Sequence, residues 1–150
     1  MKQRGFTLIE LSAVILIAVI LLTLAVPSFQ QTIVNSRLTS ASNDFVTAVH
    51  FARNTALTSR SSTVLKSISG TSDWSQGWKI ETSTGTLLKL VEQNLSNVVI
   101  NANTKTSFTY NEVGVVDNSE TLKVCSSATS NNRIISVMAS GFVKVSNGTC

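Results

Sequence analysis

The strongest pattern in the chain is an apolar stretch near its N-terminus. Residues 6–26 are mostly apolar, and from Leu11 to Val26 the only polar residues are Ser12 and Thr23. A stretch of this length can span a bilayer as a helix. Pro27 follows, and because proline lacks a backbone N–H we expect it to kink the helix without necessarily ending it.

Beyond Pro27 the apolar positions recur at helical spacing, and polar residues separate them. The stripe consists of Phe29, Ile33, Val34, Leu38, Ala41, Phe45, Val46, Val49, Ala52 and Ala56. One apolar stripe predicts an amphipathic helix that packs on a sheet. Residues 28–60 form this segment, with the helix running to about Leu57 or Thr58, and the two segments together predict one long helix.

After residue 60 the period changes from helical to the short, alternating runs typical of strands. The predicted strands are Thr63–Ser67, Gly77–Glu81, Thr86–Glu92, Val98–Asn101, Ser107–Tyr110, Gly114–Val116, Leu122–Ser126, Ile134–Met138 and Phe142–Val145. Turn-rich pieces divide them, and Ala139-Ser140-Gly141 reads as a hairpin turn. Residues 61–150 therefore predict an antiparallel β-sheet region. With the long helix packed on it, the fold class is α+β.

The amino-acid composition indicates in which compartment such a fold would lie. Charged residues make up 13% of the chain, about half of the roughly 25% that is usual in soluble domains. The apolar N-terminus and a long tract rich in Ser, Thr and Asn account for the low value. This composition suits a periplasmic or extracellular β-rich domain better than a cytosolic enzyme.

The sequence contains few residues that could perform catalysis. His50 is the only histidine, and no second ligand or base stands near it in the sequence, so we expect a surface or boundary residue. No Ser-His-Asp set, pair of catalytic carboxylates, Gly-rich phosphate loop or metal-ligand spacing can be assembled. The sequence predicts neither an enzyme nor a cofactor or metal site.

Cys125 and Cys150 are the two cysteines of the chain. In an exported protein an even number of cysteines favours a disulfide, and the alternative is two buried free thiols. A bridge would tie down the last strand. Closing a loop of about 25 residues is typically worth ~3 kcal/mol of stability.

Three interpretations of the N-terminus are open from the residues alone. A cleaved signal peptide fits the basic start, but Ala25-Val26-Pro27-Ser28 is a poor cleavage site. An ordinary transmembrane helix has the right length, but Glu10 places a carboxylate inside it at a cost of a few kcal/mol, unless the side chain reaches the headgroups. The third is a tract that is processed on its cytoplasmic side and retained.

The third interpretation rests on a resemblance. The segment Arg4-Gly5-Phe6-Thr7-Leu8-Ile9-Glu10-Leu11 resembles the class III signal of type IV pilins and type II secretion pseudopilins. The resemblance implies that a prepilin peptidase removes a leader, residues 1–5, by cutting between Gly5 and Phe6. Phe6 then becomes the N-methylated first residue, and residues 6–27 stay as a transmembrane and fibre-core helix.

The same resemblance gives Glu10 a role in assembly. In a bundle of apolar helices the carboxylate of Glu10 needs a partner. The resemblance implies that this partner is the N-terminal ammonium of a neighbouring subunit. Such a pair is costly to bury but worse to break, so it sets the register between subunits more than it adds stability.

The rest of the chain resembles the GspH/FimT-type branch of this superfamily, which implies a pilin-like fold. Three stretches carry the resemblance: Phe51–Leu57 with Arg60 and Val64, then Asp73–Trp78, then Ile134–Val137 with Gly141–Val143 and Cys150. Trp74 and Trp78 are expected to supply core area, one packed on the helix and the other partly exposed. The alternative is a platform that stacks sugars or bases.

This resemblance implies a structural minor pilin of a type IV pilus, in a tip or priming complex. The alternative is a pseudopilin of a type II secretion system. Expected partners are other major and minor pilins, the prepilin peptidase, the inner-membrane assembly machinery and the membrane itself. The protein would cross the inner membrane once, with its β-sheet region in the periplasm, and reach the cell surface in the pilus.

A further alternative is DNA binding in natural transformation. Some members of this branch bind DNA through arginines in the last hairpin, where this chain offers only Arg133 and Lys144. Removing Lys2 and Arg4 with the leader lowers the formal charge from +4 to +4 − 2 = +2. Phosphate neutralisation needs several cations on one face, so DNA binding is disfavoured unless other basic residues converge. Those residues are Arg37, Arg53, Arg60 and Lys66.

Overall fold

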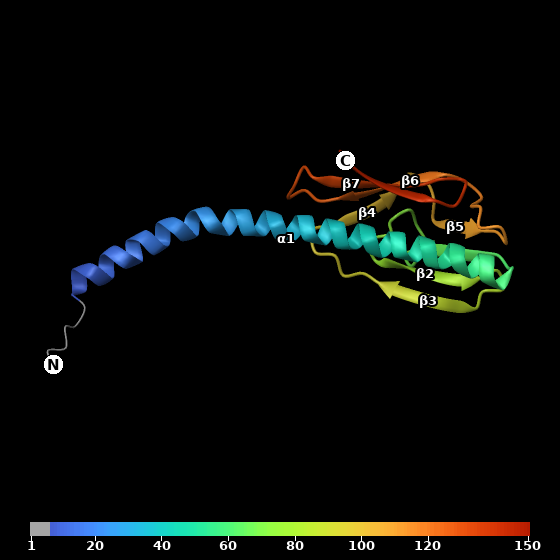
Figure 1. Cartoon of the computed structure of the whole chain (residues 1–150), viewed down its shortest axis with the longest axis horizontal. Helices are drawn as coiled ribbons and strands as arrows, with labels where there is room; N and C mark the ends of the chain where they lie inside the picture. The colour runs from blue at the N-terminus through green and yellow to red at the C-terminus, as the bar shows by residue number, and fades with distance from the viewer. Residues whose placement is uncertain (1–6) are drawn as a thin grey trace. The chain divides into compact units, whose positions relative to one another are not determined.

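The computed structural model describes residues 7–150, without the side chains of Leu24, Ala25, Pro27 and Ser28. The elements in chain order are α1 (Leu8–Ser59), β1 (Thr63–Ser67), β2 (Gly77–Thr82), β3 (Leu87–Glu92), β4 (Val99–Ala102), β5 (Ser107–Tyr110), β6 (Glu120–Cys125), β7 (Asn132–Val137) and β8 (Val143–Gly148) (Figure 1). The chain divides into two units, one ending at Ile33 and one formed by Val34–Cys150, which we call the head.

Helix α1 confirms the prediction of one long helix, and its backbone stays helical through Pro27. It ends at Ser59, one or two residues later than predicted. Arg60 takes a left-handed conformation with φ 48°, and the N–H of Ser61 donates to the carbonyl of Ala56 at 3.3 Å. This arrangement is a Schellman motif, which satisfies carbonyls at the end of a helix. Within the described part of the chain, no helix combines the length and the apolar character needed to cross a membrane.

The buried stripe of α1 follows the predicted spacing through the head. Its members are Val34, Leu38, Ala41, Phe45, Ala48, Val49, Ala52 and Ala56. Ala48 was not part of the predicted stripe, and the predicted Val46 is only half-buried. The prediction was wrong for Phe29 and Ile33, which are 70% and 49% exposed. Both belong to the unit that ends at Ile33, outside the head. Periodicity alone shows that residues share a helix face, not how far along the helix a sheet extends.

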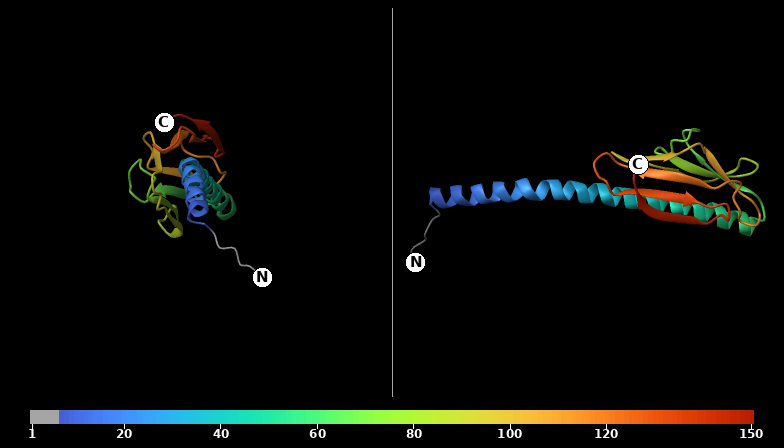
Figure 2. Two further views of the ribbon diagram at one scale, coloured as in Figure 1. Left: turned by 90° about the vertical axis from the view of Figure 1, so that its left-hand side faces the viewer. Right: turned by 90° about the horizontal axis from the view of Figure 1, so that it is seen from above.

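The strands form two sheets rather than one. Their orders are β3-β2-β1-β5 and β4-β6-β7-β8, and every pairing is antiparallel. The loop between β1 and β2 joins the sheets, because the N–H of Trp74 donates to the carbonyl of Ile100 at 2.7 Å and the N–H of Ala102 donates to Ser72 at 2.9 Å. Figure 2 shows the C-terminal part of α1 against the strands from two directions.

Eight predicted strands are present, with ends displaced by at most three residues. The ninth, Gly114–Val116, is not a strand. The side chain of Asn111 accepts hydrogen bonds from the N–H groups of Val113 and Val115, at 3.2 and 2.9 Å, and Gly114 has φ 72°. This side-chain turn competes with strand pairing, so only Val116 makes an isolated bridge, to Tyr110. The turn predicted at Ala139–Gly141 is present.

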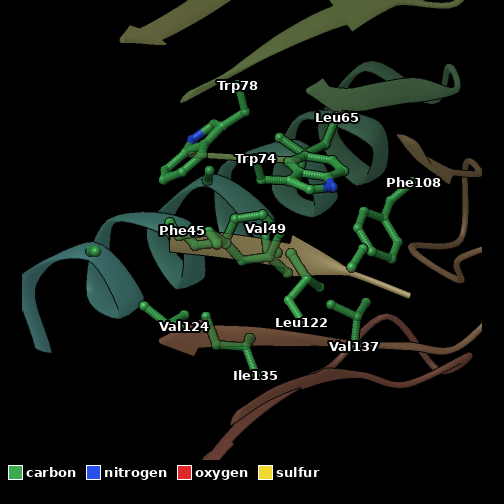
Figure 3. Packing of buried hydrophobic residues seen from close by; sticks show 14 of the residues in the cluster. Phe45, Val49, Leu65, Trp74, Trp78, Phe108, Leu122, Val124, Ile135 and Val137 are labelled. Carbon is green, nitrogen blue, oxygen red and sulfur yellow. The ribbon is translucent and has the colours of Figure 1, made fainter. Parts of the chain in front are cut away.

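The core lies where α1 meets both sheets, and aromatic rings form its centre (Figure 3). The ring of Phe45 stands edge-on to Trp74 and Trp78, with centroids 5.4 and 5.2 Å away. Both tryptophans are fully buried. The packing interpretation is therefore confirmed, and the expectation that one tryptophan is partly exposed was wrong. Buried rings cannot serve as a surface for stacking sugars or bases.

Candidate functional site

Two of the residues predicted to function in processing, Gly5 and Phe6, lie outside the described residues. Cleavage between them and methylation of Phe6 remain predictions. The described chain begins at Thr7, which directly precedes α1.

Glu10 lies in the first turn of α1 and bonds to Thr7 in both directions. The backbone N–H and the hydroxyl of Thr7 each donate to Oε2 of Glu10 at 2.9 Å. In return, the N–H of Glu10 donates to Oγ1 of Thr7 at 3.3 Å. This is a capping box, which satisfies N–H groups at a helix start. The sequence analysis missed it, although Thr-x-x-Glu before an apolar run is its signal.

The second carboxylate oxygen of Glu10, Oε1, has no partner among the described residues. Exposed apolar side chains surround it along the helix, because Leu8, Ile9 and Leu11 are 86%, 75% and 56% exposed. A carboxylate oxygen at the edge of apolar surface can receive a cation from another molecule. It would bind that cation strongly once water is excluded.

The part of α1 that precedes the head exposes large apolar side chains along most of its length. Its exposed large hydrophobic residues are Leu8, Ile9, Leu11, Val14, Ile15, Leu16, Ile17, Val19, Ile20, Leu21, Leu22, Val26, Phe29 and Ile33. Soluble monomers rarely expose a contiguous apolar surface this large, so such a surface marks contact with lipid or with other protein.

Cys125 and Cys150 form a disulfide, with Cα atoms 6.1 Å apart. Cys125 is the last residue of β6, and Cys150 lies just beyond β8. Because the sheet order is β4-β6-β7-β8, the bridge reaches across β7 and ties the edge strand β8 to β6. This covalent bond ties the C-terminal end of the chain to the second sheet.

Arg133 and Lys144 lie on opposite faces of the second sheet. Arg133 stands opposite Asn147 in β8, whereas Lys144 stands opposite Ser136 in β7. Paired residues share a face and successive residues alternate, so the three-residue step from Arg133 to Ser136 changes the face. Nη2 of Arg133 donates to Oγ1 of Thr39 on α1 at 3.1 Å. The structure therefore does not bring the two predicted nucleic-acid contacts together.

Two of the other basic residues, Arg37 and Arg53, contact different parts of the head. Nε of Arg53 donates to the carbonyl of Gly114 at 3.0 Å, and its guanidinium lies 4.2 Å from the centroid of the Phe142 ring. Nη1 of Arg37 donates to the carbonyl of Ser96 at 3.2 Å. These contacts provide no shared basic face.

Lys66 and Lys79 both pair with Glu81, which is 8% exposed. The hydrogen bond from Lys66, and then that from Lys79, hold the pKa of Glu81 below its usual value near 4.5. The lysine charge in this part of the sheet is therefore partly compensated within the protein.

Groups that could perform catalysis do not assemble in the described part of the chain. His50 is exposed, as expected from the sequence. No group of three or more His, Cys, Asp or Glu residues in residues 7–150 could hold a metal ion.

Two family models match the chain. Residues 41–141 match the model of the type II transport protein GspH, and residues 1–26 match the prokaryotic N-terminal methylation motif. The chain belongs to the GspH family. This membership and the methylation motif give it the role of a minor pilin or pseudopilin, and both the family and the fold are those of structural pilins rather than enzymes.

Solved structures show the same fold. Two crystal structures of the type IV minor pilin FimU from Pseudomonas aeruginosa strain PAO1 are similar to this GspH-family chain, each at 16% identity. The structure in space group P21 has a TM-score of 0.67 and covers 75% of this chain and 90% of its own. The corresponding values in space group P65 are 0.63, 72% and 91%. A search of curated proteins found no match.

Proposed function

We propose that this GspH-family protein is a structural minor pilin of a type IV pilus, acting in a tip or priming complex and without catalysis. The observation that carries the proposal is the Oε1 atom of Glu10, which has no partner among residues 7–150 and lies on a helix that exposes large apolar side chains along most of its length before the head. The N-terminal methylation motif over residues 1–26 supports it. No cofactor enters this role.

In the proposed fibre, the apolar helices of neighbouring subunits cover one another. Packing removes apolar surface from water or lipid without needing directional contacts. Glu10 supplies the directional contact, because its Oε1 receives the N-terminal ammonium of Phe6 from the next subunit. A misplaced subunit would bury the carboxylate without a partner, at a cost of about 3–5 kcal/mol. The pair would therefore favour one register along the fibre.

The N-terminal methylation motif over residues 1–26 supports the proposed location. Before assembly the protein crosses the inner membrane once and holds its head in the periplasm, where the Cys125–Cys150 bond can form and persist. After assembly the head lies on the cell surface as part of the pilus. Its proposed partners are other major and minor pilins, the prepilin peptidase and the inner-membrane assembly machinery.

A pseudopilin of a type II secretion system is the second candidate, favoured by the description of the matching family model. The fold match to two structures of a type IV minor pilin supports the pilus. DNA binding is not favoured, because Arg133 and Lys144 lie on opposite faces of their sheet.

The deciding experiment has two parts. The mass of the full chain extracted from membranes should correspond to a protein that begins at N-methylated Phe6. A chain that begins at Met1, or one that lacks the apolar tract, would overturn the pilin role itself. Deleting the gene should then abolish sheared surface fibres and leave protein secretion intact. Loss of secretion with normal pili would move the protein to the second candidate.

A further inference from the structure

A polar hollow of about 230 Å³ lies in the head, and it is lined by Asn35, Asn131, Arg133 and Asn147. The four residues come from α1, the loop between β6 and β7, strand β7 and strand β8. Arg133 and Asn147 face each other in adjacent strands. The lining carries one positive charge, three carboxamides and no acidic residue.

Hydrogen bonds within the protein hold the walls of this hollow in place. Oγ1 of Thr129 donates to Oδ1 of Asn35 at 3.1 Å, which fixes the loop to α1. Nη2 of Arg133 donates to Oγ1 of Thr39 at 3.1 Å, which fixes the guanidinium against the same helix. The site is therefore built before any ligand arrives, which lowers the cost of binding.

These bonds leave most of the donors unused. Arg133 carries five N–H donors, and among the described residues only Thr39 accepts from it. No described carboxylate pairs with it. Asn35 uses its oxygen for Thr129 and keeps its amide N–H groups, while the side chains of Asn131 and Asn147 have no partner in residues 7–150. The hollow thus presents donors in excess and one cation that lacks an anion.

We propose that this hollow binds a single carboxylate group. The planar guanidinium fork matches a carboxylate with two parallel hydrogen bonds, and the carboxamide N–H groups complete the shell. One cation balances one negative charge, which favours a carboxylate over a doubly charged phosphate or sulfate. The volume is below the about 300–1,000 Å³ of sites for drug-sized ligands, so the hollow suits one small group.

Two sources can present this chemistry: a small free carboxylate, or an acidic side chain of a neighbouring protein subunit. The inference goes beyond the proposed role in a fibre and does not depend on it, because the hollow lies wholly within the head. It also differs from DNA binding, which requires several cations along one face.

Acetate is the probe for the proposal. The full-length protein in detergent micelles, labelled with 15N-arginine, is titrated with sodium acetate, and a second sample receives sodium chloride at equal ionic strength. The Arg133 Nε–Hε signal is identified by its loss in Arg133→Gln. We expect it to move along a saturating curve with acetate and to stay within a linear salt drift with chloride. Equal responses to the two salts, or no saturation with acetate, would overturn the proposal.

Two variants test whether the response to acetate comes from the hollow. Asn147→Ala removes one carboxamide from the hollow and should raise the apparent Kd for acetate at least threefold. Lys144→Gln removes a cation from the opposite face of the sheet and should leave the curve unchanged. If Lys144→Gln weakens acetate binding as much as Asn147→Ala does, the response is due to general surface charge and the proposal fails.

A second measurement on Arg133→Gln distinguishes the two possible sources of the carboxylate. If a neighbouring subunit supplies the group, the recovery of this variant in sheared fibres should fall while its amount in the membrane stays at the wild-type level. If the ligand is a free small molecule, recovery in fibres stays normal. The titration with acetate tests the hollow independently of whether the protein enters a pilus at all.

Discussion

Thr7 donates two hydrogen bonds of 2.9 Å to one carboxylate oxygen of Glu10, from its backbone N–H and from its hydroxyl, and leaves the other oxygen free within the described residues. One side chain therefore serves two purposes. Its Oε2 caps the start of α1, and its Oε1 is held in a fixed direction at the edge of the apolar surface. The cap orients the group that the proposed assembly needs.

Replacing Glu10 separates these two purposes. Glu10→Gln keeps a side chain that can form the capping box but removes the charge, whereas Glu10→Leu removes both. Losing one partner of a buried pair costs about 3–5 kcal/mol, so we expect both variants to fall at least tenfold in sheared fibres while remaining in the membrane. Glu112→Gln, in an exposed loop of the head, is the matched control. Wild-type recovery of Glu10→Gln would contradict the charge pairing.

Thr7→Ala gives the complementary result. It removes the hydroxyl that bonds Glu10, and loss of a cap typically costs about 1 kcal/mol. The helix should fray at its start while the carboxylate stays charged, so recovery in fibres should fall much less than for Glu10→Gln. Quantitative immunoblots of sheared and membrane fractions measure both. If Thr7→Ala matched Glu10→Gln, the cap rather than the charge would govern assembly.

The disulfide should stabilise the head against unfolding. Cys125→Ser with Cys150→Ser removes the bridge that ties β8 to β6, and closing a loop of this size is worth about 3 kcal/mol. We expect a lower unfolding midpoint in urea, and reducing agent should bring the wild type to the level of the variant. Two alkylatable thiols in the exported, unreduced protein would show that the bond is absent.

The ring of Phe45 should be a large contributor to the stability of the head. It contacts both tryptophans and is fully buried, so Phe45→Ala should destabilise the head by about 3–5 kcal/mol. The chain has two tryptophans, both in this core, so their fluorescence reports its unfolding. Phe29→Ala, in the exposed part of α1, is the control and should leave the transition of the head unchanged. A small effect of Phe45→Ala would contradict the packing.

Glu81 should make the head sensitive to acid. The pKa of this carboxyl is lowered in the folded state by Lys66 and Lys79, so the unfolded chain takes up the proton more readily. The stabilisation is complete well above pH 4.5 and is lost as the pH falls from there through the lower folded pKa. Glu81→Gln should therefore reduce the free energy of unfolding at neutral pH, and its difference from the wild type should shrink below pH 4.5. Glu92→Gln, at an exposed position of β3 in the same sheet, is the matched control for removing a carboxylate.

The features that could be predicted from the sequence are those set by local pattern. The helical stripe, eight strands and the hairpin turn at Ala139–Gly141 each depend on the spacing of residues within a short segment. Their patterns are therefore visible in the sequence. The N-terminal signal is equally local. Phe29 and Ile33 continue the stripe that was predicted to pack on a sheet, but both are exposed, because how much of a helix is buried is a tertiary property.

The features that could not be predicted depend on pairing between distant segments. The division into two sheets follows from which strands pair, and no local pattern in the sequence shows which distant strands will pair. Arg133 and Lys144 illustrate the same limit, because their placement on opposite faces depends on the register between β7 and β8. The hollow around Arg133 requires α1 and three later segments to meet. By contrast, the Thr7–Glu10 capping box is a local feature, because Thr-x-x-Glu before an apolar run is visible in the sequence.

The bond between Cys125 and Cys150 also constrains how the molecule can associate. Strand β8 lies at the edge of its sheet, and among the described strands it pairs with β7 alone. An edge strand of this kind is a common element of domain swapping between identical chains. Because the disulfide joins β8 to β6, β8 cannot pair with the sheet of another copy unless the bond is first reduced. Copies crowded together in a membrane would thus stay separately folded and would associate through surfaces instead of exchanged strands.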